Sequence, residues 1–327
     1  MNVVVTGATG HVGANLTRAL VERGDRVRVL YRHAPPRSLD GIDCERITGD
    51  VRDSDTVDRA VQGAELVYHC AAKISLESVD PEVETINVDG VRNITNACLR
   101  HGVRRLVHFS SIHAFATEPA SEVLDEKRPL ITDQRQPPYD RSKAAGHRVV
   151  LSAVEKGLDA VVLHPAAVLG PHDYMPSRMG RVLLSLARGR MPGLVEGGFS
   201  WVDVRDIVAA ALAADTRGRR GENYLLSGHW LSFAELAAVA GEVTGRRPPR
   251  LTTPMWLARA VAPAAGGIAK LLRVDPLFNS VSLHALRIHR YTSHKKAETE
   301  LGFTPRSTKE TLEATYAWFR EVGMLPR

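Results

Sequence analysis

Short apolar runs alternate with segments of helical spacing along the first half of the chain. Residues 3–5 are consecutive valines, a pattern typical of a strand that is buried on both faces. The apolar positions that follow recur at helical spacing up to Gly24, which indicates a helix that ends at that glycine. Further strands are predicted at residues 27–30, 44–48, 65–71, 106–109 and 160–163. This alternation predicts an α/β fold in which a doubly wound parallel sheet carries helices on both faces.

The pattern loosens after Pro165. Glycine and proline become frequent between residues 171 and 198, and residues 221–227 predict one late strand. Helical spacing dominates from Ser232 onward, as in residues 233–243 and 311–322. We therefore expect a smaller, mostly helical second domain that covers the carboxyl edge of the sheet. The predicted division assigns residues 1–170 and about 200–228 to the sheet domain, and about 171–199 and 229–327 to the second domain.

A glycine-rich turn, Thr6-Gly-Ala-Thr-Gly-His-Val-Gly13, joins the first predicted strand to the first predicted helix. Its glycines allow a tight turn, a close backbone approach to a pyrophosphate, and close packing of the helix on the strand. The amino terminus of the helix adds free N–H groups and the positive end of its dipole. The turn therefore predicts a dinucleotide site whose contacts include Gly7, Thr9, Gly10, His11, Val12 and Gly13.

Several motifs taken together resemble the extended branch of the short-chain dehydrogenase/reductase superfamily. They are TGATGHVG at residues 6–13, GDVRD at 49–53, HCAA at 69–72, NVDGVRN at 87–93, FSS at 109–111, YDRSK at 139–143, HPAAVLGP at 164–171, WVDVRDIV at 201–208 and SHKKAETELGFTPR at 293–306. The chain is most similar to the group with dihydroflavonol reductases, 3β-hydroxysteroid dehydrogenases and nucleoside-sugar epimerases. The resemblance implies a Rossmann-type fold that binds a nicotinamide dinucleotide. It also implies cofactor contacts at Asp50, Val51, Ala71, Ala72, Pro165 and Val168, with Asp50 and Val51 at the adenine ring.

The end of the second predicted strand distinguishes NAD from NADP, because an acidic residue there binds the ribose hydroxyls whereas an arginine pairs with the 2′-phosphate. The sequence at this point is Val29-Leu30-Tyr31-Arg32-His33, without an acidic residue, and Arg37 could assist Arg32 from the following loop. Asp40 lies too far along that loop to be the expected ribose ligand. The pattern favours NADP(H), with NAD(H) as the alternative.

Tyr139 and Lys143 lie one helical turn apart, directly behind Pro137 and Pro138, so they project from the same face of a helix. A free tyrosine has a pKa near 10. We expect the Lys143 ammonium and the positive nicotinamide ring to lower the pKa of Tyr139. Tyr139 can then protonate a carbonyl oxygen during reduction or accept a proton from an alcohol during oxidation. Lys143 is also expected to bind the hydroxyls of the nicotinamide ribose.

A serine at the end of the fifth predicted strand completes the expected catalytic group, because ligands bind at the carboxyl ends of the strands in such folds. The resemblance assigns this role to Ser111, and Ser110 is the alternative. Phe115 stands where many sugar-handling relatives carry a tyrosine. Asn87 is expected to support the site through backbone hydrogen bonds, and Lys73 could bind an anionic group of the substrate. His69, His108 and His164 are expected to be packed in the interior, and His147 has no assigned role.

The composition excludes several classes of protein. The 327 residues include only three cysteines and no CxxC pair, which excludes a disulfide scaffold and a cysteine-rich zinc site, suits a reducing cytoplasm, and leaves no predicted metal site. The net charge is +6, but the basic residues are dispersed, so nucleic-acid binding is not expected. No secretory signal follows Met1. The apolar stretch at residues 255–272 contains Arg259, Pro263 and Lys270, so it predicts an amphipathic helix over an apolar pocket rather than a membrane span.

Two classes of enzyme fit these residues. The first is an NAD(P)-dependent reductase or dehydrogenase of a bulky apolar small molecule, whose pocket is expected to include Met175, Met179, Leu183, Leu184, Trp256, Leu257, Val261, Ile268 and Leu271. The second is an NAD-dependent epimerase or dehydratase of nucleotide-linked sugars, whose diphosphate could meet Arg178, Arg181, Arg205, Arg287 and Arg290. A non-catalytic protein that senses dinucleotides is a further alternative, and either a monomer or a homodimer is expected.

Overall fold

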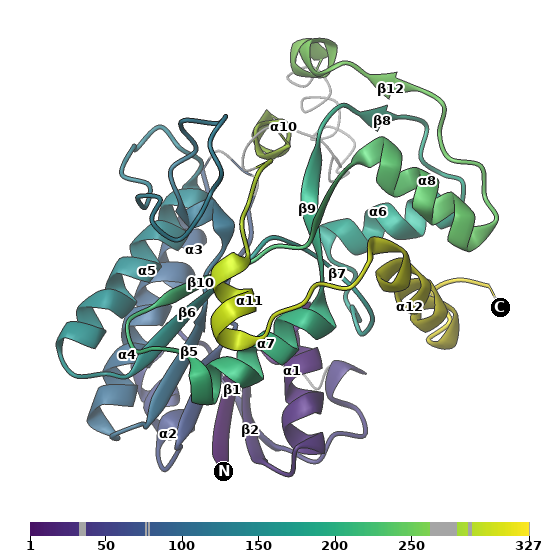
Figure 1. Ribbon diagram of the computed structural model, residues 1–327. Helices are drawn as coiled ribbons and strands as arrows, with labels where there is room; N and C mark the ends of the chain where they lie inside the picture. The colour runs from purple at the N-terminus through teal and green to yellow at the C-terminus, as the bar shows by residue number, and fades with distance from the viewer. Residues whose placement is uncertain (33–36, 76, 78, 262–279, 287–289, 327) are drawn as a thin grey trace.

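The computed structural model describes residues 1–32, 37–75, 77, 79–261, 280–286 and 290–326 (Figure 1). Within them, the central sheet has the strand order β10-β6-β5-β4-β1-β2-β3, and every neighbouring pair is parallel. The strands are β1 (Asn2–Thr6), β2 (Arg26–Tyr31), β3 (Glu45–Thr48), β4 (Leu66–His69), β5 (Arg105–Phe109), β6 (Ala160–Pro165) and β10 (Asn223–Leu226). The doubly wound parallel sheet predicted from the sequence is therefore confirmed.

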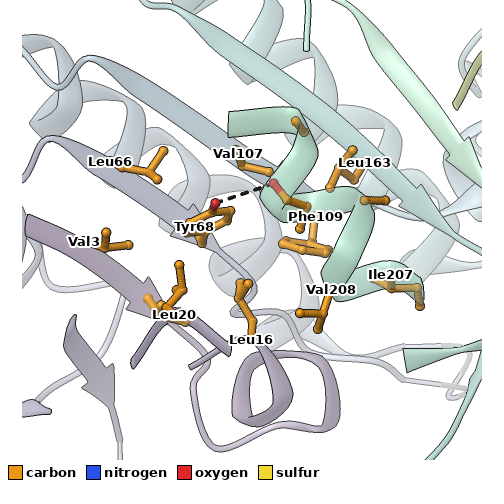
Figure 2. Close-up of a cluster of buried hydrophobic side chains, with 14 of the residues drawn as sticks. Val3, Leu16, Leu20, Leu66, Tyr68, Val107, Phe109, Leu163, Ile207 and Val208 are labelled. Atoms are coloured by element: carbon orange, nitrogen blue, oxygen red, sulfur yellow. Dashed lines mark hydrogen bonds between the residues drawn. The ribbon is translucent and has the colours of Figure 1, made fainter. Parts of the chain in front are cut away.

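Helices cover both faces of this sheet, because successive side chains of a strand point to opposite faces. Val3 and Val5 of β1 pack toward α1 (His11–Glu22) and α7 (Val204–Arg217), whereas Val4 packs on the other side. Figure 2 shows the first of these cores, in which the Tyr68 hydroxyl of β4 donates to the carbonyl oxygen of Ala211 in α7 at 3.5 Å. The other face is covered by α2 (Ser54–Val61), α4 (Gly90–Arg100) and α5 (Pro138–Glu155), and α11 (Lys295–Leu301) packs beside α7.

A second core lies above the carboxyl edge of the sheet (Figure 1). It is built from the sheet β11-β9-β7, with β7 (Ala167–Leu169), β9 (Gly198–Asp203) and β11 (His229–Ser232), and from α6 (Arg178–Ala187), α8 (Phe233–Thr244), α10 (Ser280–Ala285) and α12 (Thr308–Glu321). The short strands β8 (Leu194–Val195) and β12 (Thr252–Thr253) pair beside it. Within this core, the ring of Phe199 stands edge-on to Trp201, with centroids 5.3 Å apart. None of β7, β9 and β11 was predicted, because their short, mixed sequences lack a clear alternation.

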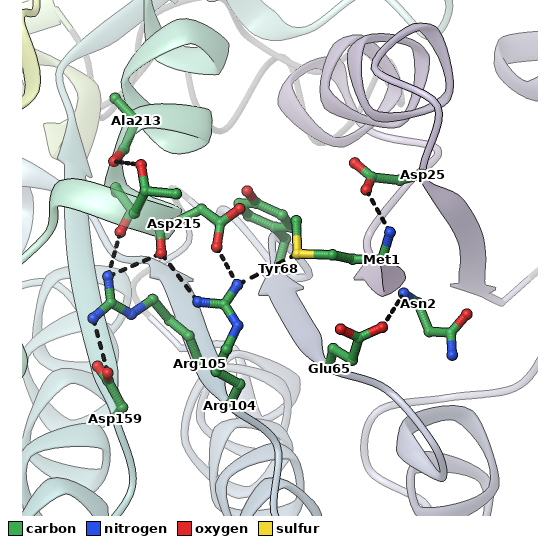
Figure 3. Close-up of polar contacts among 12 residues, drawn as sticks. Met1, Asn2, Asp25, Glu65, Tyr68, Arg104, Arg105, Asp159, Ala213 and Asp215 are labelled. Atoms are coloured by element: carbon green, nitrogen blue, oxygen red, sulfur yellow. Dashed lines mark hydrogen bonds and ion pairs between the residues drawn. The ribbon is translucent and has the colours of Figure 1, made fainter.

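Ion pairs fasten the opposite, amino-terminal edge of the sheet (Figure 3). Asp215, near the carboxyl end of α7, is fully buried and pairs with Arg104 at 2.5 Å and with Arg23 at 3.3 Å. Arg105 donates to the carbonyl oxygens of Ala214 and Asp215 at 2.9 and 3.0 Å, which satisfies groups that a helix end leaves without an intrahelical partner. These ion pairs and hydrogen bonds hold α7 against the amino-terminal edge of the sheet. The candidate functional groups lie at the carboxyl edge.

Candidate active site

The glycine-rich turn has the geometry that a dinucleotide requires. Gly7 adopts a φ of +69°, and a Cβ at this position would lie 2.6 Å from the backbone nitrogen of Ala71. A Cβ at Gly13 would collide with the carbonyl oxygen of Gly7. Gly10 is the N-cap of α1, and the first turn of that helix carries no acidic side chain and no side-chain cap. The N–H groups at this helix end are therefore suited to an anionic group such as a pyrophosphate.

Two adjoining cavities lie along the carboxyl edge of the sheet and share Ala72 and Ile74. The outer cavity, of about 740 Å³, is lined by Arg32, Gly49, Asp50, Arg52, Lys73 and Glu82 in addition to the shared residues. The inner cavity, of about 440 Å³, contains most of the predicted contacts: Gly7, Gly10, His11, Val12, Gly13, Ser111, Tyr139, Lys143, Pro165 and Val168. An elongated ligand with two halves fits this arrangement better than a single compact one.

Three predicted cofactor contacts line neither cavity. Thr9 lies in the turn but not at the cavity wall. Val51 is buried, and its side chain would lie 2.7 Å from a Cβ on Gly90, so Val51 packs against α4. Ala71 abuts Gly7, and its backbone N–H donates to the Thr6 hydroxyl at 3.3 Å. Val51 and Ala71 therefore support the residues of the cavity wall without lining it.

Ser111, Tyr139 and Lys143 meet at the inner cavity. Tyr139 and Lys143 project from one face of α5, and both side chains are buried. The Ser111 and Tyr139 hydroxyls are hydrogen-bonded to one another, and the Lys143 ammonium donates to the Phe109 carbonyl oxygen at 3.0 Å. Ser110 also lines the cavity, but its hydroxyl has no hydrogen-bond partner among the described residues. This geometry favours Ser111 over Ser110 as the partner of Tyr139.

The electrostatics of this group differ from the expectation in one respect. Burial raises the pKa of the Tyr139 phenol, the hydrogen bond with Ser111 opposes the rise, and the Asp140 carboxylate adds to it. The lowering of the Tyr139 pKa that was expected from Lys143 together with the nicotinamide ring is not seen in the protein alone, where burial dominates. Burial also lowers the pKa of Lys143, to about 8. At neutral pH the phenol keeps its proton and the lysine is still an ammonium.

Asn87 holds the active-site helix in place. It lies in the π-helical turn Thr85–Asp89, and its side-chain amide donates to the Lys73 carbonyl oxygen and to the Ser142 hydroxyl, both at 2.9 Å. Its Oδ1 accepts the Lys73 N–H at 2.8 Å, and Ser142 donates in turn to the Tyr139 carbonyl oxygen at 2.7 Å. The amide thus connects the loop after β4 to the helix that carries Tyr139, which is the supporting role expected for Asn87.

The outer cavity is bordered by paired charges. Arg52 pairs with Asp50 at 2.8 Å, and its hydrogen bond lowers the pKa of that carboxyl. Arg32 lies 3.9 Å from the same carboxylate, and 47% of its side chain is exposed. Lys73 is bound to Glu82 at 2.7 Å and to Asp80 at 3.1 Å, on the outer cavity rather than beside Tyr139. Of these cations, Arg32 is held least closely by carboxylates and is suited to an added phosphate.

An acid–base pair that the sequence did not reveal stands beside Tyr139. His113 and Asp140 both line the inner cavity, and the Nδ1 atom of His113 lies 3.3 Å from the Asp140 carboxylate. Burial opposes protonation of His113, but Asp140 outweighs it and raises the pKa of the imidazole. The backbone N–H of His113 also donates to the Ser111 hydroxyl at 3.2 Å. The cavity wall next to the Ser111 and Tyr139 hydroxyls therefore carries an imidazole–carboxylate pair.

Four other histidines are packed in the interior, three of them as expected. His69 and His108 stack with ring centroids 5.3 Å apart, and His147 of α5 lies 4.9 Å from His164 of β6. All four are buried. Among the described residues, no group of histidine, cysteine, aspartate or glutamate side chains is arranged to hold a metal ion. His147 is thus a packing residue between the active-site helix and the sheet.

The apolar wall of the inner cavity comes partly from residues that the sequence did not single out. Met175 and Met179 line it as predicted, together with Phe199, Phe233, Val281 and Leu286. Leu183 and Leu184 were expected there but are buried in the second core. Trp256, Leu257 and Val261 are exposed instead of lining the cavity. Ile268 and Leu271 lie outside the described residues.

Most of the described arginines that were considered for a diphosphate do not line the inner cavity. Arg178 lines the inner cavity, whereas Arg181 does not. Arg205 pairs with Asp203 at 2.6 Å, and the Arg290 guanidinium stacks over Trp230 at 4.4 Å. Arg287 lies outside the described residues. A cluster of arginines at the cavity is therefore not seen in the described part of the chain.

Comparisons with known proteins agree with this geometry. A family model described as the NAD dependent epimerase/dehydratase family matches residues 3–227. A sterol demethylase protein B from Methylococcus capsulatus is 38% identical over 330 residues, which cover 99% of this chain and all of that protein. A putative dihydroflavonol 4-reductase from Synechocystis is 32% identical, covering 98% of this chain and 94% of its own. The crystal structure of gox2253 is 32% identical with a TM-score of 0.86, and 99% of each chain is covered. No described helix has the length and apolar character needed to cross a bilayer.

Proposed function

Because the chain belongs to the NAD dependent epimerase/dehydratase family, and so to the extended short-chain dehydrogenase/reductase enzymes, we propose that it interconverts a ketone and a secondary alcohol on a bulky apolar substrate with NADP(H). The observation that carries this proposal is the inner cavity. There Ser111, Tyr139 and Lys143 face the glycine-rich turn on one side and apolar side chains on the other. A concave apolar site with few polar groups is the usual form of a small-molecule site.

The proposed mechanism uses the three side chains in distinct roles. The bound nicotinamide supplies or accepts the hydride. During reduction Tyr139 donates its proton to the carbonyl oxygen, and the Ser111 hydroxyl holds that oxygen in place. Lys143 binds the ribose hydroxyls as an ammonium. The raised pKa of Tyr139 suits the reductive direction, because the phenol must carry its proton before the reaction.

The substrate class rests on the cavity wall and on the relatives' names. Met175, Met179, Phe199 and Phe233 offer apolar and aromatic surface. Among the described arginines of the diphosphate set, Arg178 reaches the cavity. The names of two relatives refer to ring systems: a sterol demethylase protein B and a putative dihydroflavonol 4-reductase. Together these observations support ketones on fused or linked rings.

A panel of substrates tests the proposal. We expect steroid- or flavonoid-like ketones to oxidise NADPH, measured by the loss of its absorbance, and UDP- and GDP-sugars to remain unchanged in a coupled epimerisation assay. Arg178 and the family membership keep the epimerase as the second candidate. Clear epimerisation of a nucleotide sugar without any ketone reduction would replace the proposed function with that alternative.

Replacement of Arg32 by alanine tests the cofactor preference. A charge-assisted bond to the 2′-phosphate contributes about 1.5–3 kcal/mol, or roughly ten- to a hundredfold in affinity. NADPH is expected to bind more tightly than NADH by that margin in the parent protein, and R32A should remove most of the difference. Titration of both cofactors by fluorescence measures it.

Arg26→Ala is the matched control, because Arg26 is exposed at the amino end of β2, whereas Arg32 follows the carboxyl end of that strand, and Arg26 lines neither the outer nor the inner cavity. It should leave both affinities near the parent values. Equal dissociation constants for NADPH and NADH in the parent protein would contradict the assignment of Arg32.

A further inference from the structure

The segment at residues 246–261 exposes apolar side chains that pack neither in the core beside the central sheet nor in the second core. It leads from α8 through β12 into a helical stretch at residues 255–261, at the end of the molecule opposite the N-terminus (Figure 1). Leu251 is 72% exposed, Trp256 71% and Val261 51%. Large apolar side chains gathered on one exposed segment indicate a binding surface more often than a solvated loop.

The same segment is strongly basic. Arg246, Arg247, Arg250 and Arg259 are all exposed, and the sequence contains no acidic residue between Glu242 and Asp275. From residue 243 to residue 274 the chain carries six lysines and arginines, which equals the net charge of +6 for all 327 residues. The remainder of the chain therefore balances 37 basic against 37 acidic residues. By formal count, the excess positive charge of the protein is concentrated in this stretch.

We propose that residues 246–261 dock the protein on the surface of an anionic phospholipid bilayer. A basic segment with exposed tryptophan and aliphatic side chains suits the boundary between lipid headgroups and acyl chains, where arginines meet the phosphates and the indole enters the interface. Nucleic acid would use the arginines but gains nothing from Leu251 and Val261. A second copy of the chain would bring a second cluster of arginines with the same charge.

Docking of this segment on a bilayer would bring the inner cavity close to molecules that are dissolved in the lipid. The Met255 N–H donates to the Glu196 carboxylate at 3.0 Å, and the adjacent Gly197 abuts Leu286, which lines the inner cavity with Val281 and Ala285. A molecule dissolved in the bilayer would therefore be delivered near the apolar wall of the cavity. The docking itself does not depend on which reaction the cavity performs.

Sedimentation with lipid vesicles tests the proposal. The full-length protein is expected to bind vesicles of phosphatidylglycerol and phosphatidylcholine at least about tenfold more tightly than vesicles of phosphatidylcholine alone, and salt should weaken the binding. The double variant Arg247→Glu/Arg250→Glu should lose that preference. The matched control Arg92→Glu/Arg135→Glu changes the net charge equally at exposed positions outside the segment, and it should keep most of the binding.

The depth of Trp256 provides an independent readout. Of the four tryptophans, Trp201 and Trp318 are buried, and Trp230 is half-buried with the Arg290 guanidinium stacked over its ring. Lipids brominated on the acyl chains should therefore quench mainly the emission of Trp256, which is 71% exposed. Trp256→Phe should remove most of this quenching. Turnover of a soluble ketone without vesicles should be the same in the charge-reversed variant and the parent, which separates docking from the proposed function.

Equal binding to both kinds of vesicle would overturn the proposal, and so would unchanged binding in the Arg247→Glu/Arg250→Glu variant. Sedimentation velocity adds one more outcome. If the same variant shifts the protein between dimer and monomer while vesicles bind neither form, the segment is a contact between copies of the chain and the lipid assignment is wrong.

Discussion

Turnover of the Tyr139→Phe variant is expected to fall by roughly a hundred- to ten-thousandfold, because general acid catalysis by a positioned side chain contributes that much. The substitution removes the hydroxyl that bonds to Ser111 but keeps the ring that fills the cavity wall. Cofactor affinity should stay near the parent value, since the phenol is proposed to meet the substrate oxygen rather than the dinucleotide. Steady-state kinetics on a verified substrate and a separate cofactor titration measure the two effects.

Tyr291→Phe serves as the matched control, because Tyr291 is half exposed and lines neither cavity. It should retain parental turnover. Retention of most activity by Tyr139→Phe would show that Tyr139 is not the acid, and attention would turn to the His113–Asp140 pair.

Lys143→Met is expected to reduce both turnover and cofactor affinity, because Lys143 lines the inner cavity and its ammonium is proposed to bind the ribose. The parent protein should also show a pH dependence that the variant lacks. Burial lowers the pKa of Lys143 to about 8, so the ammonium is present below that pH and is lost above it. Cofactor affinity should therefore be highest near neutral pH and decline as the pH rises through about 8.

Cofactor titrations between neutral and moderately alkaline pH measure this decline. In Lys143→Met the affinity should be low and independent of pH over the same range. A pH profile of the same shape in the parent and the variant would assign the titration to another group.

The sequence predicted the sheet well because most of its strands are buried on both faces, which leaves unbroken apolar runs such as residues 3–5. It predicted the shared position of Tyr139 and Lys143 for a similar reason. Both lie on one helix, so their spacing alone determines which face they share.

The residues of the cavity wall were harder to predict, because helical spacing shows which residues share a face but not what that face packs against. Met179 and Leu183 lie one turn apart on α6, yet Met179 reaches the cavity and Leu183 continues into the second core. The apolar stretch that contains Trp256 was read as a pocket wall for the same reason. An apolar face requires a partner, and its sequence alone does not identify that partner.

The His113–Asp140 pair shows the other limit. The two residues are 27 positions apart, and packing of the turn after β5 against α5 brings them together. Asp140 lies within the YDRSK motif and His113 lies just after FSS, but neither holds a position to which a motif assigns a role, so the sequence offered no signal for the pair. The raised pKa of Tyr139 was missed likewise, because burial is a property of the folded chain.

The four packed histidines set a lower limit on the pH at which the fold is stable. Burial lowers the pKa of His69 to about 3 and that of His147 to about 4, and it holds His108 and His164 well below 6.5. In the unfolded chain these imidazoles take up protons as the pH falls through about 6.5, whereas in the folded chain they stay neutral. Above that pH they leave the free energy of unfolding unchanged, and below it each one favours the unfolded state. Mild acid is therefore expected to destabilise the fold, through proton uptake by side chains that take no direct part in the proposed reaction.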